Sequence, residues 1–288
     1  MVLRIVTDST SDLPSEAVQA LGITVVPLSI LFREEELLDG VDIQSEQFFR
    51  RLEREAAIPT TTQPAPALFQ RAYTRLIAEG ATEILSIHLS ALLSGTLEAA
   101  RQGAQGVERA RIEVLDSRTL SLGLGVGVME AAKAARAGAT LAEARALAAD
   151  IYRRTHLFFT LETLEYLRRG GRMSRGQELL GTLLKVKPLL AIHDGEVVAI
   201  GRVRTKQRAI EDLLARCAEL RPLQHSFVCH GTTPDEANYV RERLAAIDPN
   251  ATITVGRVTP VIGVHAGPGV LGMGVVTAPD DHSPPLAT

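Results

Sequence analysis

Hydrophobic positions in the first half of the chain alternate between two patterns. Short runs rich in β-branched residues are typical of buried strands, and each is followed by a turn and a longer segment with helical spacing. The strand-like runs occupy residues 3–8, 23–32, 83–88 and 111–117, and the helical segments occupy residues 15–22, 89–103 and 119–137. This order predicts a parallel sheet whose strands are joined by crossover helices.

The pattern changes after a further helical segment at residues 140–155. Strand-like runs at residues 189–193 and 197–203 flank the sequence Asp-Gly-Glu, a hairpin signal that an all-parallel sheet would lack. Beyond the hairpin, helical and strand-like segments alternate at residues 205–220, 226–231, 234–247 and 252–259. These segments predict a sheet with both parallel and antiparallel strands.

We therefore predict an α/β protein of two domains. A Rossmann-like domain with a parallel sheet is expected at residues 1–153, and a mixed α/β domain at residues 154–278. The last segment, residues 279–288, has no apolar period and contains two adjacent prolines, so we expect a disordered tail there.

Composition narrows the function classes and the compartment. The chain has 31 Lys and Arg against 34 Asp and Glu, so no overall basic field draws it to nucleic acid. Its two cysteines, Cys217 and Cys229, form no disulfide framework and indicate reduced thiols. No run reaches the ~18 apolar residues of a membrane helix, and no apolar signal segment opens the chain. We therefore expect a cytoplasmic protein without stable membrane insertion.

Motifs for cofactors and metals are missing. The sequence GLGVGV at residues 123–128 lacks the third glycine of a dinucleotide fingerprint, because Val128 stands in its place. Its glycines are better explained as relieving crowding between a helix and the sheet. The chain has no phosphate loop, no H-E-x-x-H and no paired Cys-x-x-Cys, so we expect neither a cofactor nor a metal ion.

The segment PTTTQPAP at residues 59–66 concentrates three hydroxyls and an amide between three prolines. Helical patterns lie on both sides, so the segment is interpreted as a rigid loop between two helices. Two roles remain open for its polar groups, ligand binding and helix capping, and Pro66 suits the first turn of the following helix. These residues alone favour capping.

Other polar candidates also have ordinary structural explanations. Ser94 lies in LLSGT and not in the G-x-S-x-G elbow of α/β-hydrolases, so it suits an N-cap as well as a nucleophile. His265, taken alone, is an ordinary loop histidine. Cations alternate with other residues in GRVRTKQR, which is typical either of one solvated face of a strand end or of a patch that docks a partner or a phosphate.

Several short motifs together resemble one family over nearly the whole chain. They occur in the order and spacing of the DegV family of bacterial fatty-acid-binding proteins: DSTSDLP at 8–14, TTQP at 61–64, LSGT at 93–96, LDS at 115–117, LEYLRRGGR at 164–172, KPLL at 187–190 and HAGPGVLG at 265–272. The resemblance implies a two-domain α/β protein that encloses a long-chain fatty acid in a tunnel between the domains. It also implies a carrier that presents this ligand to a separate fatty acid kinase and has no catalysis of its own.

The resemblance also implies roles for particular residues. The carboxylate is expected to contact Thr61 or Thr62 and Ser94, with Gly95 of the same motif and His265 close by. Arg172 and Arg204 are expected near the site mouth, in contact with the kinase or the incoming phosphate. The sequence departs from the family where Ala266 replaces a Thr and where Ala91 and Leu92 replace a polar pair, so we expect a less polar mouth.

This ligand also makes physical sense of the polar segment. Each buried CH₂ of a tail contributes roughly 0.8 kcal/mol, whereas a carboxylate cannot be buried without polar partners. Neutral hydroxyls hold the head group without an ion pair and leave it nucleophilic toward a phosphoryl group. In this arrangement, His265 is expected either to orient the hydroxyls or to compensate charge when it is protonated.

Two other functions compete with the carrier. A hydrolase or acyltransferase would use Ser94 as nucleophile and His265 as base, although the sequence shows no third member of a triad. A binder of a small polar ligand is the other alternative, as in dihydroxyacetone kinases, whose substrate domain has a related fold. The apolar fraction of 45% suits a lipid tunnel no better than an ordinary core.

Overall fold

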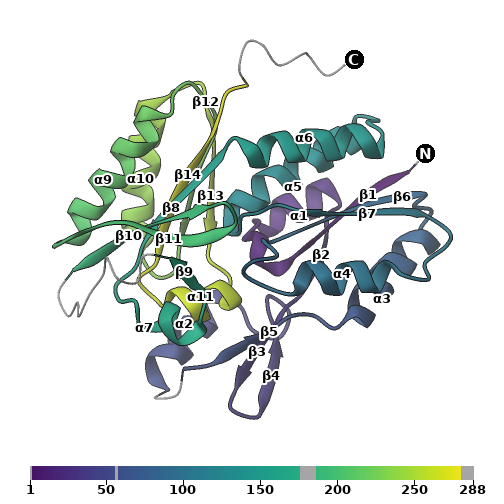
Figure 1. The fold of residues 1–288 in the computed structure, drawn as a ribbon, viewed down its shortest axis with the longest axis horizontal. Helices are drawn as coiled ribbons and strands as arrows, with labels where there is room; N and C mark the ends of the chain where they lie inside the picture. The colour runs from purple at the N-terminus through teal and green to yellow at the C-terminus, as the bar shows by residue number, and fades with distance from the viewer. Residues whose placement is uncertain (1, 56–57, 176–185, 280–288) are drawn as a thin grey trace.

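The computed structural model of this protein describes residues 2–55, 58–175 and 186–279 (Figure 1). Apart from Pro279, the expected disordered tail lies outside the described residues. Two sheets form the body of the molecule, and a small third sheet projects from one end (Figure 1).

The first sheet is parallel throughout, as the repeated strand and helix pattern predicts. Its strand order is β2-β1-β6-β7, and each neighbouring pair is parallel. The strands are β1 (Leu3–Asp8), β2 (Thr24–Val26), β6 (Glu83–His88) and β7 (Arg111–Asp116). The helices of this half are α1 (Ser15–Leu21), α3 (Pro66–Ala78), α4 (Thr96–Ala104), α5 (Ser121–Arg136) and α6 (Leu141–Arg153), and a single 3-10 turn, η1 (Ser9–Ser11), follows β1.

The small sheet differs from the sequence prediction. One strand was expected over residues 23–32, but the chain leaves the first sheet after Val26 and enters a second strand at Ser29. Pro27 lies at the break, where it has no backbone N–H to donate to a ladder. The resulting sheet is antiparallel and has the order β4-β3-β5. Its strands are β3 (Ser29–Phe32), β4 (Glu35–Leu38) and β5 (Thr60–Thr62), and helix α2 (Ser45–Arg54) lies between β4 and β5 in the chain.

The polar segment at residues 59–66 is therefore not a simple loop. It does lie between two helices, α2 and α3, and α3 begins at Pro66 as predicted. Its three threonines, however, form the edge strand β5, because a β-branched run between prolines suits an extended edge. The capping interpretation is wrong for these hydroxyls, since α3 has no side-chain cap at its N-terminus.

The second half forms a seven-stranded mixed sheet with the order β13-β12-β14-β8-β10-β11-β9. The predicted hairpin is confirmed, because β10 and β11 pair antiparallel around the Asp-Gly-Glu turn. The strands are β8 (Thr155–Thr160), β9 (Met173–Arg175), β10 (Lys187–His193), β11 (Glu196–Val203), β12 (Leu223–His230), β13 (Thr252–Arg257) and β14 (Leu271–Thr277). The helices are α7 (Glu165–Gly170), α9 (Lys206–Glu219), α10 (Pro234–Ile247) and α11 (Pro260–Ala266).

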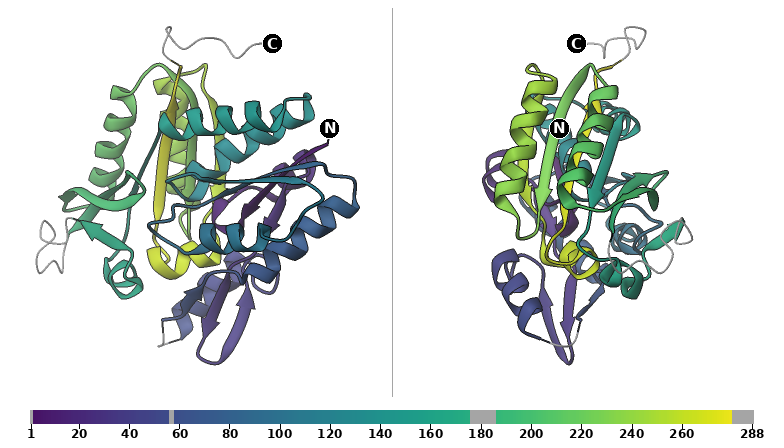
Figure 2. Two further views of the ribbon diagram at one scale, coloured as in Figure 1. Left: turned by 45° about the vertical axis from the view of Figure 1, so that its right-hand side comes forward. Right: turned by 90° about the vertical axis from the view of Figure 1, so that its left-hand side faces the viewer.

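The two main sheets share one hydrophobic core across helix α5. Helices α9 and α10 cover one face of the mixed sheet, whereas α5 packs between its other face and strand β1 (Figure 2). Buried residues from both halves, among them Leu122, Leu157 and Val261, belong to the same cluster. Residue 153 ends helix α6 just before β8 begins. We retain this junction as the proposed domain boundary.

The glycines of α5 relieve crowding, but two of them do so against helix α6 and the turn η1 and not against the sheet that the sequence analysis expects. A Cβ at Gly127 would lie 2.4 Å from the ring of Tyr152 on α6, and one at Gly125 would lie 2.6 Å from the carbonyl oxygen of Ser11. Both distances are shorter than any real contact, so only glycine lets α5 approach its neighbours this closely. The close approach matters because α5 begins at the cavity described below.

Candidate functional site

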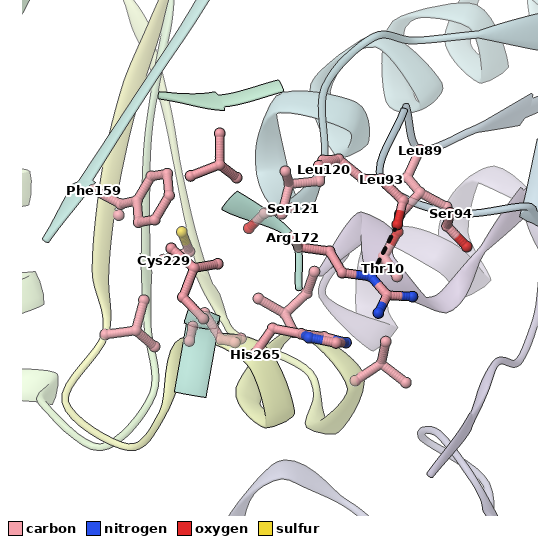
Figure 3. A pocket seen from close by; sticks show the side chains of 18 of the residues that line it. Thr10, Leu89, Leu93, Ser94, Leu120, Ser121, Phe159, Arg172, Cys229 and His265 are labelled. Atoms are coloured by element: carbon pink, nitrogen blue, oxygen red, sulfur yellow. Dashed lines mark hydrogen bonds between the residues drawn. The ribbon is translucent and has the colours of Figure 1, made fainter. Parts of the chain in front are cut away.

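A cavity lies between the two main sheets, where α5, α11 and the LSGT loop meet (Figure 3). The space between atoms amounts to about 840 Å³, including the part that opens to solvent. Most of its wall is apolar and comes from both halves of the chain: Leu28, Leu89, Leu93, Leu120, Leu157, Phe159, Leu167, Val197, Val258, Val261, Ile262, Ala266 and Val270.

The cavity is polar at one end and apolar at the other. Ser94, Arg172 and His265 lie together at one end in Figure 3, whereas Phe159 and Cys229 lie at the other. Thr61 also lines the cavity and hydrogen-bonds to His265, so it belongs to the polar end. Four of the residues implied by the resemblance, from four separate segments, are thus brought to one cavity. Such an arrangement suits an amphipathic ligand with one polar head.

Thr61 and His265 are held together by a direct hydrogen bond. The Thr61 Oγ1 atom lies 2.8 Å from His265 Nε2. The other ring nitrogen, Nδ1, is buried without a hydrogen-bond partner and faces Gly170, where an added Cβ would lie only 2.1 Å away. A proton on Nδ1 would therefore be a buried, unsatisfied donor. The arrangement favours the tautomer in which Nε2–H donates to Thr61, which leaves the Thr61 hydroxyl proton free for a ligand.

His265 is held in its neutral form. Burial, with a smaller contribution from the nearby Arg172 guanidinium, lowers the pKa of His265 to about 4. Of the two roles considered from the sequence, this favours orientation of a hydroxyl over charge compensation. A neutral imidazole also leaves the head group of a ligand without a second fixed cation beside Arg172.

The low pKa predicts how this histidine responds to acid. The unfolded chain takes up a proton as the pH falls through 6.5, the ordinary value, whereas folded His265 takes it up only near its pKa of about 4. This group therefore costs no stability above pH 6.5 and progressively destabilises the fold as the pH falls from 6.5 toward 4. Long-range ¹H–¹⁵N correlation spectra of the ligand-free protein at pH 6 should show a neutral ring protonated at Nε2. An imidazolium, or a proton on Nδ1, would contradict the proposed orientation of Thr61.

Ser94 combines the two roles that the sequence left open. Its Oγ accepts a hydrogen bond from the Thr96 backbone N–H at 3.3 Å and lies 2.9 Å from Thr96 Oγ1, so it supports the first turn of α4. It also lines the cavity. The formal N-cap is Gly95, one residue later. The hydroxyl is therefore fixed by the start of a helix while it faces a ligand space.

Gly95 has a packing role that the sequence analysis did not consider. It is not among the lining residues of the cavity, and a Cβ at this position would lie 1.9 Å from Gln63 Oε1. The LSGT loop therefore touches the segment that follows β5 at this point, through the flexible end of the Gln63 side chain. This contact brings Ser94 and Thr61 to the same end of the cavity. A direct contact of Gly95 with a ligand stays a prediction.

The remaining predicted residues lie outside the cavity. Thr62 is exposed and does not line the cavity. Successive side chains of a strand point to opposite faces, so only one of the two candidate threonines, Thr61, reaches the cavity. Arg204 is exposed in the turn between β11 and α9. The cation run around it is not one strand face, because Lys206 begins α9 and pairs with Glu162 at 3.3 Å and Glu236 at 2.6 Å. The contact of Arg204 with a partner stays a prediction.

The departures from the family pattern have different consequences. Ala266 lines the cavity, so its methyl group makes the wall beside His265 less polar, as expected. Leu92 does not line the cavity, and 61% of its surface is exposed. Its neighbour Ala91 is exposed as well. The replaced pair therefore changes the outer surface and not the ligand space.

Two further polar residues line the cavity, Thr10 and Ser121, and the sequence analysis did not single them out. Ser121 donates a hydrogen bond to Asp12, and Asp12 accepts another from the Thr259 N–H at 2.8 Å. Burial raises the pKa of Asp12 to about 6. Thr259 precedes α11, so this buried carboxyl ties the start of α5 to the helix that carries His265. The DSTSDLP motif contains Thr10 and Asp12 and was the available signal.

The described residues contain neither a metal-binding cluster nor a membrane-spanning helix. Within residues 2–55, 58–175 and 186–279, no group of three or more His, Cys, Asp or Glu side chains is arranged to hold a metal ion. In the same part of the chain, no helix is long and apolar enough to cross a membrane.

Comparisons with known proteins agree with the fold. A curated DegV domain-containing protein of Deinococcus radiodurans is 39% identical over 278 residues, which cover 95% of this chain and 98% of that protein. One from Streptomyces coelicolor is 38% identical over 275 residues, covering 94% of this chain and 97% of that protein.

Solved structures are similar as well. A DegV family protein from Thermus thermophilus, whose structure is described by its fatty acid binding, has a TM-score of 0.89 at 34% identity. The match covers 96% of this chain and 100% of the Thermus chain. DegV from Bacillus subtilis, described as a fatty acid binding protein, has a TM-score of 0.86 at 29% identity, with coverage of 96% and 99%. A family model matches residues 2–278, and its description is uncharacterised protein, DegV family. The chain therefore belongs to the DegV family.

Proposed function

We propose that this protein binds one long-chain fatty acid in the cavity. The carboxylate lies among Thr61, Ser94 and His265, and the tail extends along the apolar wall toward Phe159. The observation that carries the proposal is the wall of the cavity, which is mostly aliphatic and aromatic and has Ser94, Arg172 and His265 together at one end (Figure 3). The fatty acid binding described for the Thermus and Bacillus relatives supports the same ligand.

The polar end is suited to a carboxylate that must react later. Thr61 offers a hydroxyl proton that His265 directs away from itself, and Ser94 offers a second hydroxyl at a fixed position. Hydrogen bonds to an ionised acceptor contribute about 1.5 to 3 kcal/mol each, enough to offset part of its desolvation. Because both donors are neutral, the carboxylate oxygens keep the charge that a nucleophile needs.

We further propose that the protein presents the fatty acid to a separate kinase, which forms the acyl phosphate, and that the chain has no catalysis of its own. The rival hydrolase would need His265 to activate Ser94. The hydrogen bond of His265 Nε2 goes to Thr61, its Nδ1 faces Gly170, and Ser94 bonds to Thr96. Ser94 and His265 are therefore not paired as nucleophile and base in this geometry.

The apolar wall also favours a lipid over a small polar ligand. A polar ligand needs donors and acceptors around it, whereas most of the residues around this cavity are aliphatic or aromatic. Both cysteines are free and buried, as expected of a protein in a reducing compartment. We therefore propose a cytoplasmic lipid carrier.

The handover is tested with Ala variants of Arg172, Arg204 and His265. We expect Arg204→Ala to leave palmitate affinity nearly unchanged and to slow acyl phosphate formation by a cognate fatty acid kinase, with a smaller loss at higher salt, because exposed charge contacts are screened within roughly 8 to 10 Å. Arg172→Ala should reduce the rate more than the affinity, and His265→Ala should impair both. Affinity and coupled rate are measured side by side.

The outcomes separate the three residues. If Arg204→Ala changes neither quantity, the exposed cation has no partner role. If the two arginine variants lose affinity and rate in equal proportion, these arginines serve the ligand alone, and the proposed docking surface is wrong.

A further inference from the structure

A second hollow lies on the other side of the polar end of the cavity. This outer cleft is formed by β5, α7 and α11, which pack together beneath the mixed sheet (Figure 1). It encloses about 610 Å³, including space open to solvent. Thr61, Arg172 and His265 line both the cavity and the outer cleft. A head group held by these residues therefore has the lipid space on one side and the outer cleft on the other.

The outer cleft is positively charged. Besides the shared residues, its polar side chains are Thr60, Tyr166 and Arg169, and no Asp or Glu is among its described lining residues. The Arg172 guanidinium donates to two backbone carbonyls, those of Leu93 at 3.3 Å and Gly170 at 2.5 Å. These bonds hold the side chain in place without neutralising its charge.

Arg169 is available for a second ligand. It pairs with Glu165 one turn earlier on α7, at 2.6 Å, and about half of each side chain is exposed, 54% and 46%. An exposed pair of this kind is weak and exchanges readily. Two guanidinium groups, three residues apart in the chain, thus line one hollow, and each carries a planar fork of donors that matches a phosphate.

We propose that the outer cleft binds the phosphate group of an acyl phosphate, the product of the proposed reaction. This inference rests on the proposed fatty acid function. In the reaction, a carboxylate oxygen forms a bond to the γ-phosphorus of a nucleoside triphosphate supplied by the kinase. The bond from that phosphorus to the β–γ bridging oxygen breaks, and its electron pair leaves with the nucleoside diphosphate. No proton is transferred, and the new phosphate is attached to an oxygen that Thr61 holds at the inner edge of the outer cleft.

Arg169 lines the outer cleft but not the lipid cavity, and Arg172 borders both. Before phosphoryl transfer, the neutral hydroxyls of Thr61 and Ser94 hold the carboxylate in the cavity. After transfer, the head group carries a second negative charge, and Arg169 and Arg172 bind it from the outer cleft. The acyl phosphate, which water would hydrolyse, thereby stays attached to the carrier.

The test uses two probes of equal chain length. One is palmitate, and the other is a long-chain 2-oxoalkylphosphonate, in which a methylene replaces the bridging oxygen of the acyl phosphate and prevents hydrolysis. Arg169→Gln should weaken the phosphonate by roughly tenfold or more and leave palmitate within about twofold, because only the phosphonate loses a charged partner. The matched control is Arg168→Gln, an exposed arginine on the same helix that does not line the outer cleft. It should change neither affinity.

Glu165→Gln provides a test in the opposite direction. It removes the carboxylate that competes for Arg169, so it should tighten the phosphonate and leave palmitate unchanged. Inorganic phosphate in millimolar excess should lower the apparent affinity of the phosphonate in the wild-type protein but not in Arg169→Gln, and it should not displace palmitate. Displacement of palmitate by inorganic phosphate would place free phosphate at the carboxylate end and overturn the inference.

The failures are distinguishable. If the wild-type protein does not bind palmitate, the proposed function is wrong, and the inference falls with it. If palmitate binds but Arg169→Gln weakens both probes equally, or neither, the outer cleft is not a phosphate site while the fatty acid site stands.

Discussion

Thr61→Val should lower the affinity for palmitate by roughly tenfold to hundredfold, whereas Thr62→Val should leave it within about twofold. The two threonines are neighbours on β5 and have the same chemistry, but only Thr61 lines the cavity and bonds to His265. Valine is nearly the same size as threonine, so the substitution removes the hydroxyl and keeps the β-branched strand residue. The loss comes from a buried carboxylate that is left without one of its donors.

The comparison is made by displacement of a fluorescent fatty acid, with the melting temperature of each variant as a control for the fold. Equal losses in both variants would show that β5 as a whole had been disturbed. An unchanged affinity in Thr61→Val, with the fold intact, would remove Thr61 from the head-group site.

Affinity should also rise steeply with the length of the saturated chain. Each buried CH₂ contributes roughly 0.8 kcal/mol, which is about a fourfold gain in affinity. Between a 12-carbon and a 16-carbon acid, the expected gain is therefore on the order of two hundredfold, the largest effect that we predict. The gain should stop when the tail reaches the end of the cavity near Phe159 and Cys229, because further carbons would need space that the packed wall does not offer.

This series needs no variant and distinguishes the lipid carrier from a binder of small polar ligands. It is measured by titration calorimetry below the micelle concentration of each acid, with the methyl ester of the 16-carbon acid as a control for the head group. An affinity that does not depend on chain length would contradict the apolar tunnel. A methyl ester that binds as tightly as the acid would contradict the carboxylate site.

Much of the fold could be predicted from the sequence because its signals are local. Most strands and helices are indicated by the spacing of apolar residues within each segment, and the hairpin around Asp194 and Gly195 carries its own turn signal. Strand β5 could not be predicted in the same way. Its three threonines lie between prolines, and only pairing with β3, about thirty residues earlier, makes them a strand.

The site was predictable in part for the same reason. The motif order brought Ser94 and His265 to attention, but the choice between Thr61 and Thr62 depends on which face of β5 meets α11. That choice is set by tertiary packing and leaves no mark in the local sequence. Gly95 and Gly170 were similarly hidden, because their importance lies in atoms of Gln63 and His265 that approach from distant segments. The outer cleft, built from β5, α7 and α11, could only be found in three dimensions.

A crystal structure of the protein with palmitate tests the central claim most directly. We predict one fatty acid in the cavity, its carboxylate within hydrogen-bonding distance of Thr61 and Ser94 hydroxyls, and its methyl end near Phe159. A carboxylate at the Phe159 end, or palmitate bound only outside the cavity, would contradict this account.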